Sequence, residues 1–176
     1  MTKPVDGGSV TSLLTIDPGL TCCGWAFWNR GVLVKCGLSR TQEVELDRRV
    51  QAHGEEIMEE IQDTPHPLIL VIEKPEVYPQ RFMKGDPNDL IDLAVVVGGI
   101  VAQVSASLDT QLILPKTWKG QVPDDVLQPR TLAKLRDLEV AAVKNPVPLG
   151  KPRTVPPSLK HNMMDAVGIG LWALGR

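Results

Sequence analysis

The amino-acid sequence predicts an α/β fold with a mixed five-stranded sheet, in which three antiparallel strands are followed by parallel strands and helices flank the sheet. Three observations predict it. Short apolar runs separated by turn residues open the chain, a stretch of helical periodicity leads into a long buried-strand run, and an apolar helix leads into a last short strand. Because strands joined through a helix pair in parallel, the later strands extend an antiparallel start.

The antiparallel strands are expected at residues 13–17, 22–28 and 32–37. The first is an apolar, partly β-branched run that ends at Asp17 and is closed by Pro18 and Gly19. Asn29-Arg30-Gly31 separates the second strand from the third and has the composition of a tight hairpin turn. These runs therefore predict three consecutive antiparallel strands.

The middle of the chain predicts an amphipathic helix, a buried strand and an apolar helix. Apolar residues recur at helical spacing at Leu46, Val50, Ile57 and Ile61. The strand at residues 68–73 ends at Glu73. Asp86 is a plausible N-cap for the next helix, with Pro87 at its first position, and the expected buried stripe is Leu90, Leu93, Ala94, Val97 and Val101. Since residues 90–104 are too few to cross a bilayer comfortably, we expect a core helix and no membrane span.

Shorter elements are expected after this helix. Residues 112–114 form a short strand that Pro115 cuts off, and a helical patch runs from about residue 131 to 143. Residues 145–157 are too rich in proline for regular structure and are interpreted as a mobile loop. The final helix is expected to begin near residue 158 and to end at Gly175.

Length and composition favour one globular domain. The chain of 176 residues can bury a core without disulfides, and we expect residues 1–10 to be a loose leader and residues 11–176 a single domain. Cys22, Cys23 and Cys36 have neither zinc spacing nor an even disulfide framework, which indicates reduced core residues. The expected location is the cytoplasm, because no secretion signal is recognisable.

The net charge of -2 conceals an uneven distribution along the chain. Acids dominate residues 43–63, whereas lysine and arginine dominate residues 111–160. The basic part has the charge needed to hold a phosphate backbone, and the acidic part would repel DNA. Solvated surfaces on both parts are an equally good explanation of the charges alone.

Three carboxylates are expected at one rim of the sheet. Asp17 and Glu73 end strands that pair in parallel if the intervening helix is a crossover, and Asp165 lies early in the last helix. Taken alone, Asp-Pro-Gly is also an ordinary turn. Three carboxylates together repel one another unless cations neutralise them, and such oxygen ligands suit Mg²⁺ or Mn²⁺. Two such ions would support phosphodiester hydrolysis by activating a water and stabilising the leaving oxygen.

Three segments in this order, LLTIDPGLTCCGWAF, LILVIEKPEVYPQRFMKGDPNDLIDLAVVVGGIVA and HNMMDAVGIGLWAL, resemble RuvC-type Holliday junction resolvases in a divergent, bacteriophage-like form. The resemblance spans nearly the whole chain. It implies a ribonuclease-H-like fold and a homodimer that nicks four-way DNA junctions with divalent metal ions, in a bacterial or phage-infected cell. Asp17, Glu73 and Asp165 match the metal-binding acids of the family. No nucleotide cofactor is implied.

The sequence departs from the family one helical turn before the last acid. The family has Asp or His at this position, and this chain has Asn162 with His161 beside it. The Asn162 carbonyl could serve as a metal ligand, and His161 as a ligand or proton shuttle. For both residues, a polar position at the start of a helix without a catalytic part is the alternative.

The resemblance also implies residues that contact DNA. Lys116 and Lys119 match lysines that contact the junction in relatives, and Lys160 belongs to the same basic part of the chain. Trp118 either stacks on an unpaired base or covers the edge of the core, and the second is favoured. The loop after Glu73 carries three residues expected at the junction centre, with Phe82 as a possible wedge: Tyr78, Phe82 and Lys84.

A structure-selective endonuclease for Holliday junctions and other branched DNA is therefore the predicted function. A catalytically inactive scaffold of the same fold that binds branched DNA is the alternative, and Asn162 is the feature in its favour. A sugar-kinase or actin-like ATPase needs two such domains and glycine-rich phosphate loops, for which this chain is too short.

Overall fold

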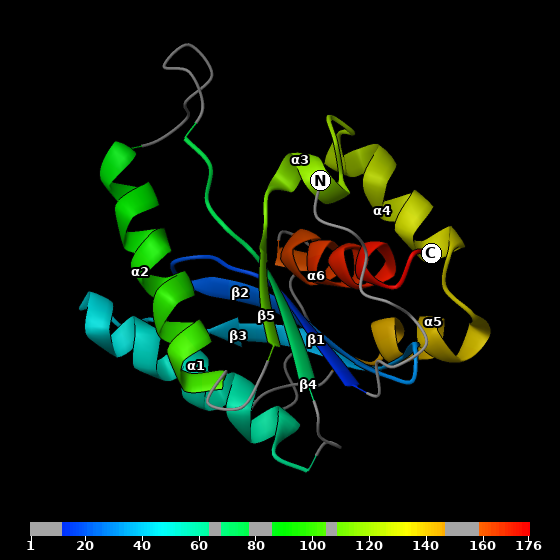
Figure 1. Cartoon of the computed structure of the whole chain (residues 1–176), viewed down its shortest axis with the longest axis horizontal. Helices are drawn as coiled ribbons and strands as arrows, with labels where there is room; N and C mark the ends of the chain where they lie inside the picture. The colour runs from blue at the N-terminus through cyan, green and yellow to red at the C-terminus, as the bar shows by residue number, and fades with distance from the viewer. Residues whose placement is uncertain (1–11, 64–67, 78–85, 105–108, 147–158) are drawn as a thin grey trace.

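The computed structural model describes residues 12–63, 68–77, 86–104, 109–146 and 159–176. A single five-stranded sheet has the strand order β3-β2-β1-β4-β5 (Figure 1). Its strands are β1 Ser12–Asp17, β2 Cys22–Asn29, β3 Val32–Arg40, β4 Leu68–Glu73 and β5 Asp109–Ile113. The first three strands are antiparallel, and β4 and β5 continue the sheet in parallel with β1. The mixed five-stranded sheet expected from the sequence is thus confirmed.

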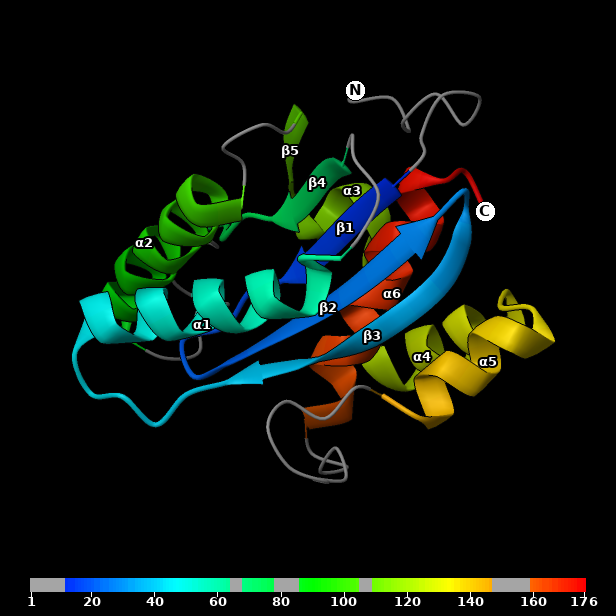
Figure 2. The same cartoon turned by 90° about the horizontal axis from the view of Figure 1, so that it is seen from below.

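Helices cover both faces of the sheet. They are α1 Leu46–Ile61, α2 Pro87–Val104, α3 Pro115–Trp118, α4 Asp124–Ala133, α5 Asp137–Lys144 and α6 Lys160–Ala173. Helices α1 and α2 lie on one face, and α6 lies on the other with α4 and α5 beside it (Figure 2). Three layers therefore enclose two separate halves of the hydrophobic core.

The central strand β1 is rich in apolar residues because both of its faces are covered. Leu13 packs on the α6 side, whereas Leu14 and Ile16 pack on the side of α1 and α2. All three side chains are fully buried, because successive residues of a strand point to opposite faces and helices cover both. The position of β1 between two helical layers thus requires its apolar residues.

The hairpin between β2 and β3 confirms the expected turn. Arg30 and Gly31 both have positive φ angles, 49° and 73°, and this left-handed backbone gives a two-residue turn a twist that matches the strands. Strand β3 continues beyond residue 37, where the sequence predicted its end. Its last residue, Arg40, pairs with Cys22 at the start of β2.

The prediction of one helical patch at residues 131–143 is wrong. Residues 134–136 separate α4 from α5, since the N–H groups of Lys134 and Leu135 donate to Thr131 and Leu132 and close α4 tightly. Arg136 is extended, and its N–H donates to the Glu139 carboxylate at 2.8 Å. This capping bond begins α5 as a new helix.

Smaller differences concern the ends of elements. Strand β5 begins three residues before the predicted residue 112, and residues 115–118 form the short helix α3 with Pro115 at its first turn. Helix α6 ends at Ala173, before Gly175. The expected leader at residues 1–10 and most of the expected loop at 145–157 lie outside the described residues.

Helix α2 buries a different stripe from the expected one. The buried residues are Val96, Val97, Ile100 and Val104, and of the predicted stripe only Val97 is among them. The reason is that the C-terminal half of α2 packs on the sheet and α1, while the N-terminal half leaves Ala94 exposed and Leu90 partly covered. By length and composition alone α2 would be long and apolar enough to cross a membrane, although one face belongs to the core.

Candidate active site

Asp17 and Glu73 lie side by side at the carboxyl end of the sheet. Ile16 pairs with Ile72 in the parallel register of β1 and β4, and the two acids are the next residue of each strand. Both side chains are half-buried. The parallel pairing expected from the sequence is confirmed, and it gives the rim two neighbouring carboxylates.

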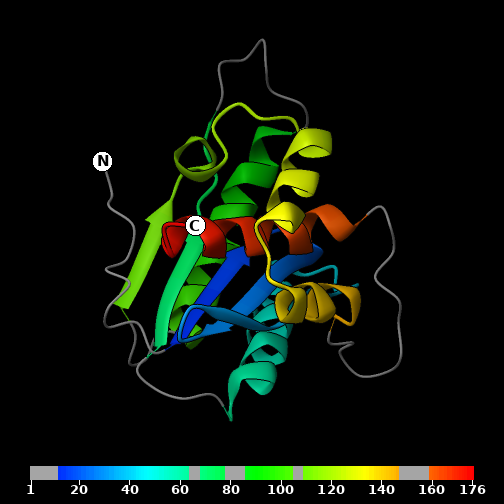
Figure 3. The ribbon, with the colours of Figure 1, turned by 90° about the vertical axis from the view of Figure 1, so that its right-hand side faces the viewer.

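Helix α6 brings Asp165 to the same part of the molecule. It crosses the strands on one face of the sheet (Figure 3), and the buried Thr15 hydroxyl of β1 donates to the Ala166 carbonyl at 2.7 Å. This bond joins the residue after Asp165 to a strand position two residues before Asp17. Asp165 is only 4% exposed, so its carboxylate depends on partners within the protein.

Lys119 is the cation at this site. Its Nζ lies 3.0 Å from Asp165 Oδ2 in an ion pair of which the lysine side chain is 23% exposed. Burial lowers the pKa of Lys119, but Asp165, by its charge and its hydrogen bond, and then the charges of Glu73 and Asp17 outweigh burial and raise it above the usual value. All three predicted acids therefore act on one ammonium group, as expected if they gather at one rim.

Trp118 binds the second acid of the site. Its indole N–H donates to Glu73 Oε2 at 2.6 Å, and the Lys119 ammonium lies 5.2 Å from the centre of the Trp118 ring. The ring also packs against the hydrophobic core on the α6 side. This position agrees with the alternative in which Trp118 covers the edge of the core.

The donor chemistry of the site suits a divalent cation. Asp165 already binds the positive charge of Lys119, and hard oxygen ligands are those that Mg²⁺ and Mn²⁺ prefer. Within the described residues, however, no three His, Cys, Asp or Glu side chains stand close enough together to form a finished metal site. Two of the acids instead bind N–H donors from Trp118 and Lys119.

The other proposed ligands, His161 and Asn162, lie in the first turn of α6. Asn162 donates from Nδ2 to the Cys22 carbonyl at 2.9 Å, which ties α6 to the start of β2. His161 and Lys160 are exposed. A ligand role for Asn162 and a proton-transfer role for His161 stay predictions.

The expected DNA-contacting residues fall into two groups. Lys116 is exposed on α3 and pairs with Glu76 at 2.7 Å, whereas Lys119 is turned inward to Asp165. Tyr78, Phe82 and Lys84 lie outside the described residues. Lys116 is therefore exposed at the surface, whereas Lys119 contacts Asp165.

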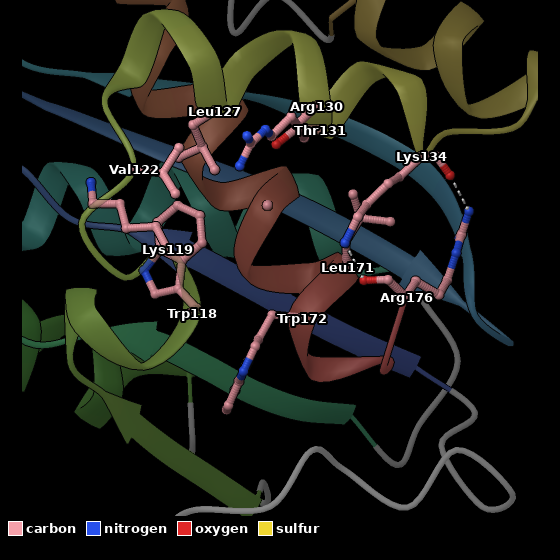
Figure 4. Close-up of a pocket in the computed structure, with 11 residues that line it drawn as sticks. Trp118, Lys119, Val122, Leu127, Arg130, Thr131, Lys134, Leu171, Trp172 and Arg176 are labelled. Atoms are coloured by element: carbon pink, nitrogen blue, oxygen red, sulfur yellow. Dashed lines mark hydrogen bonds between the residues drawn. The ribbon is translucent and has the colours of Figure 1, made fainter.

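A cavity of about 300 Å³ lies beside Trp118 and Lys119, the two residues that bind Glu73 and Asp165. Trp118 and Lys119 line one end, and α4 and the C-terminal half of α6 line the rest (Figure 4). Arg130 of α4 and Lys134, the residue after α4, add positive charge, and Lys134 donates to the Arg176 carbonyl at 2.8 Å. Basic side chains thus line the same cavity as Trp118 and Lys119, in the part of the chain whose composition predicted affinity for phosphate.

Two positioning residues were missed by the sequence analysis. Thr15 looked like an ordinary β-branched strand residue, and Trp118 was considered only for base stacking or core packing. For Trp118 a signal was present: β5 is parallel to β4, so the segment that follows β5 emerges at the same rim as Glu73. No comparable signal pointed to Thr15.

The fold defined by this sheet and its helices is the RuvC-like form of the ribonuclease-H-like fold, as the resemblance implied. No protein-family model matches the chain, and no curated protein matches it. Solved structures do match over nearly the whole chain.

RuvC of Thermus thermophilus in complex with a Holliday junction substrate is 18% identical, with a TM-score of 0.56 over 92% of this chain and 91% of that one. A second structure of Thermus thermophilus RuvC is 16% identical, with a TM-score of 0.57 over 91% of both chains. The yeast mitochondrial Holliday junction resolvase Ydc2 is 13% identical, with a TM-score of 0.52 over 92% of this chain and 79% of that one.

Proposed function

We propose that this protein is a structure-selective endonuclease that resolves Holliday junctions and related branched DNA by metal-dependent phosphodiester hydrolysis. The observation that carries the proposal is geometric: Asp17 and Glu73 end neighbouring parallel strands at the carboxyl rim of the sheet, and the adjacent residues Trp118 and Lys119 bind Glu73 and Asp165 respectively. The solved structures with this fold include a RuvC bound to a Holliday junction and a second junction resolvase. An inactive scaffold would have no need of three acids at this position.

Each acid has a distinct place in the proposed reaction. Asp17 and Glu73 would hold a first Mg²⁺ or Mn²⁺ ion and Asp165 a second, and the bound ions would supply an activated water and charge for the leaving oxygen. His161 stands four residues before Asp165 on α6, a spacing that puts the two residues on one helix face. It is our candidate for proton transfer.

The basic surface beside the acids would hold the DNA. Lys116 on α3 and Lys160 at the start of α6 are exposed, and Arg130 is exposed on α4 beside the cavity. Side chains of this charge neutralise phosphates and make binding depend on salt. The junction-centre role of Phe82 and Lys84 is carried over from the resemblance.

A side-by-side digestion tests the function. We expect a four-way junction to be nicked symmetrically in Mg²⁺ or Mn²⁺, with little or no cutting of a linear duplex of the same sequence, because a linear duplex lacks the branch. Product lengths on a denaturing gel give the cleavage sites, a three-way junction tests preference among branches, and EDTA is the control. Equal cutting of linear and branched DNA, or cutting that persists in EDTA, would contradict the proposal.

We also propose that the protein acts as a homodimer through α2. Two large apolar side chains on the outer face of this helix are exposed, Ile91 by 63% and Val95 by 46%. They lie four residues apart and therefore side by side on one face. An exposed apolar stripe on a helix is typical of an interface, and a second copy of the chain would give the two active sites that symmetric nicking requires.

Replacing Ile91 with Glu is expected to weaken this dimer at least about tenfold, because a charge in an apolar interface is costly. Sedimentation equilibrium measures the dissociation constant. The matched control is Leu138→Glu, which changes another exposed apolar residue, on α5, and should leave association unchanged. Equal association of wild type and Ile91→Glu would exclude α2 as the interface.

The cytoplasm of a bacterial or phage-infected cell is the location we propose, since this is where such DNA is found.

A further inference from the structure

The contact between Trp118 and Glu73 joins a neutral indole N–H to a carboxylate. A side chain from the segment after β5 donates a 2.6 Å hydrogen bond to a carboxylate at the end of β4. Bonds from a neutral donor to an ionised acceptor are stronger than bonds between neutral groups. The indole N–H is a donor only and has one direction, so it restricts where that carboxylate oxygen can lie.

The Trp118 ring is itself fixed by α6. Gly168 lies where a Cβ atom would be 2.6 Å from Trp118 Cζ3, so the ring edge rests directly on the helix backbone. Gly168 is three residues after Asp165, about one helical turn away. Trp118 therefore connects the β4 acid to the α6 helix that carries the third acid.

We propose that Trp118 is a positioning residue of the active site: it holds Glu73 in the orientation that receives the metal ion, with its ring set against Gly168 of α6. This inference rests on the proposed function and adds a residue to it. Groups that orient a metal ligand typically contribute tenfold or more to affinity, although they never touch the ion. The size of the Trp118 ring alone would not give this effect, since the N–H must point at the carboxylate.

Metal affinity of the full chain without DNA tests the proposal. We expect Trp118→Phe, which keeps a ring and removes the N–H donor, to weaken Mn²⁺ binding by about tenfold in isothermal titration calorimetry. The matched control is Trp172→Phe, the same change in another tryptophan that lines the cavity, from α6. Its Mn²⁺ affinity should equal that of the wild type.

A second variant separates positioning from folding. Gly168→Ala keeps the N–H but places a methyl group against the ring, so it should also weaken Mn²⁺ binding. In the Trp118→Phe background the same Gly168→Ala change should have little further effect, because the bond it displaces is already absent. If Gly168→Ala weakens Mn²⁺ binding as much in the Trp118→Phe background as in the wild type, its effect does not pass through the bond from Trp118 to Glu73.

The indole N–H gives a spectroscopic signature. In ¹H–¹⁵N spectra the resonance lost in Trp118→Phe should shift upfield in Glu73→Gln, where the acceptor loses its charge, and should move when Mg²⁺ is added. Equal Mn²⁺ affinity of Trp118→Phe and Trp172→Phe, or no response of this resonance to Glu73→Gln, would overturn the inference and leave the nuclease proposal standing. Absence of Mn²⁺ binding by the wild type would overturn both.

Discussion

Asp17→Asn is expected to reduce junction cleavage by about a thousandfold or more while junction binding stays within a few-fold of wild type. The substitution keeps the shape of the side chain and removes the negative charge at the end of β1, beside Glu73. Metal ions at such sites supply several kcal/mol of transition-state stabilisation, and each 1.36 kcal/mol corresponds to a factor of ten in rate. Loss of a carboxylate near phosphates does not weaken electrostatic attraction to DNA.

Single-turnover cleavage rates and electrophoretic mobility shifts, measured on the same four-way junction, separate the effect on cleavage from the effect on binding. The control is Asp109→Asn, the same change at an exposed residue at the start of β5, toward the opposite end of the sheet from Glu73. This variant should cut like the wild type. If Asp17→Asn cuts as fast as Asp109→Asn, Asp17 is not a ligand and the assignment of the three acids is wrong.

The position of these acids could be predicted because it follows from local patterns. Asp17 and Glu73 each end a short apolar run, and the helix between the runs makes the strands parallel, so the two side chains must share a rim. The helical spacing of Asp165 within the final apolar segment placed it on α6. Strand and helix periodicity are properties of neighbouring residues, which a sequence displays directly.

The partners of the acids could not be predicted in the same way. Lys119 meets Asp165 across 46 positions of sequence, and its charge alone suggested a contact with DNA. The break between α4 and α5 has a similar origin, since the Arg176 guanidinium donates to the Lys134 carbonyl at 3.0 Å from far along the chain. Such contacts depend on how whole elements pack. Residues 134–136 contain no glycine or proline, the residues that would indicate a helix break in the sequence.

Glu139→Gln is expected to lower the free energy of unfolding by about 3 kcal/mol at neutral pH. Glu139 is fully buried and receives two bonds from Arg176, at 2.7 and 2.8 Å, together with the N–H groups of Arg136 and Leu33. Removing one member of a buried ion pair typically costs about 3–5 kcal/mol. The lower end applies because the Arg176 side chain is 20% exposed.

The loss of unfolding free energy in Glu139→Gln should depend on pH in a defined direction. Burial alone would raise the pKa of Glu139, but the bonds from Arg176, Arg136 and Leu33 and the Arg176 charge lower it from 4.5 to about 2. A carboxyl group whose pKa is lower in the folded state stabilises the protein above its unfolded pKa and loses this effect as pH falls through the folded value. The difference between wild type and Glu139→Gln should therefore be largest above pH 4.5 and shrink toward pH 2.

Urea unfolding across this pH range measures the difference. Glu60→Gln is the control, because Glu60 pairs with Lys35 at 3.7 Å where the lysine side chain is 41% exposed, and pairs at the surface contribute less than about 1 kcal/mol. A Glu139→Gln effect as small as that of Glu60→Gln, or one that does not change with pH, would show that the Arg176 pair does not hold α5 against the end of α6. The expected result instead shows that this pair stabilises the packing of α5 against the end of α6, next to the cavity that Arg176 lines.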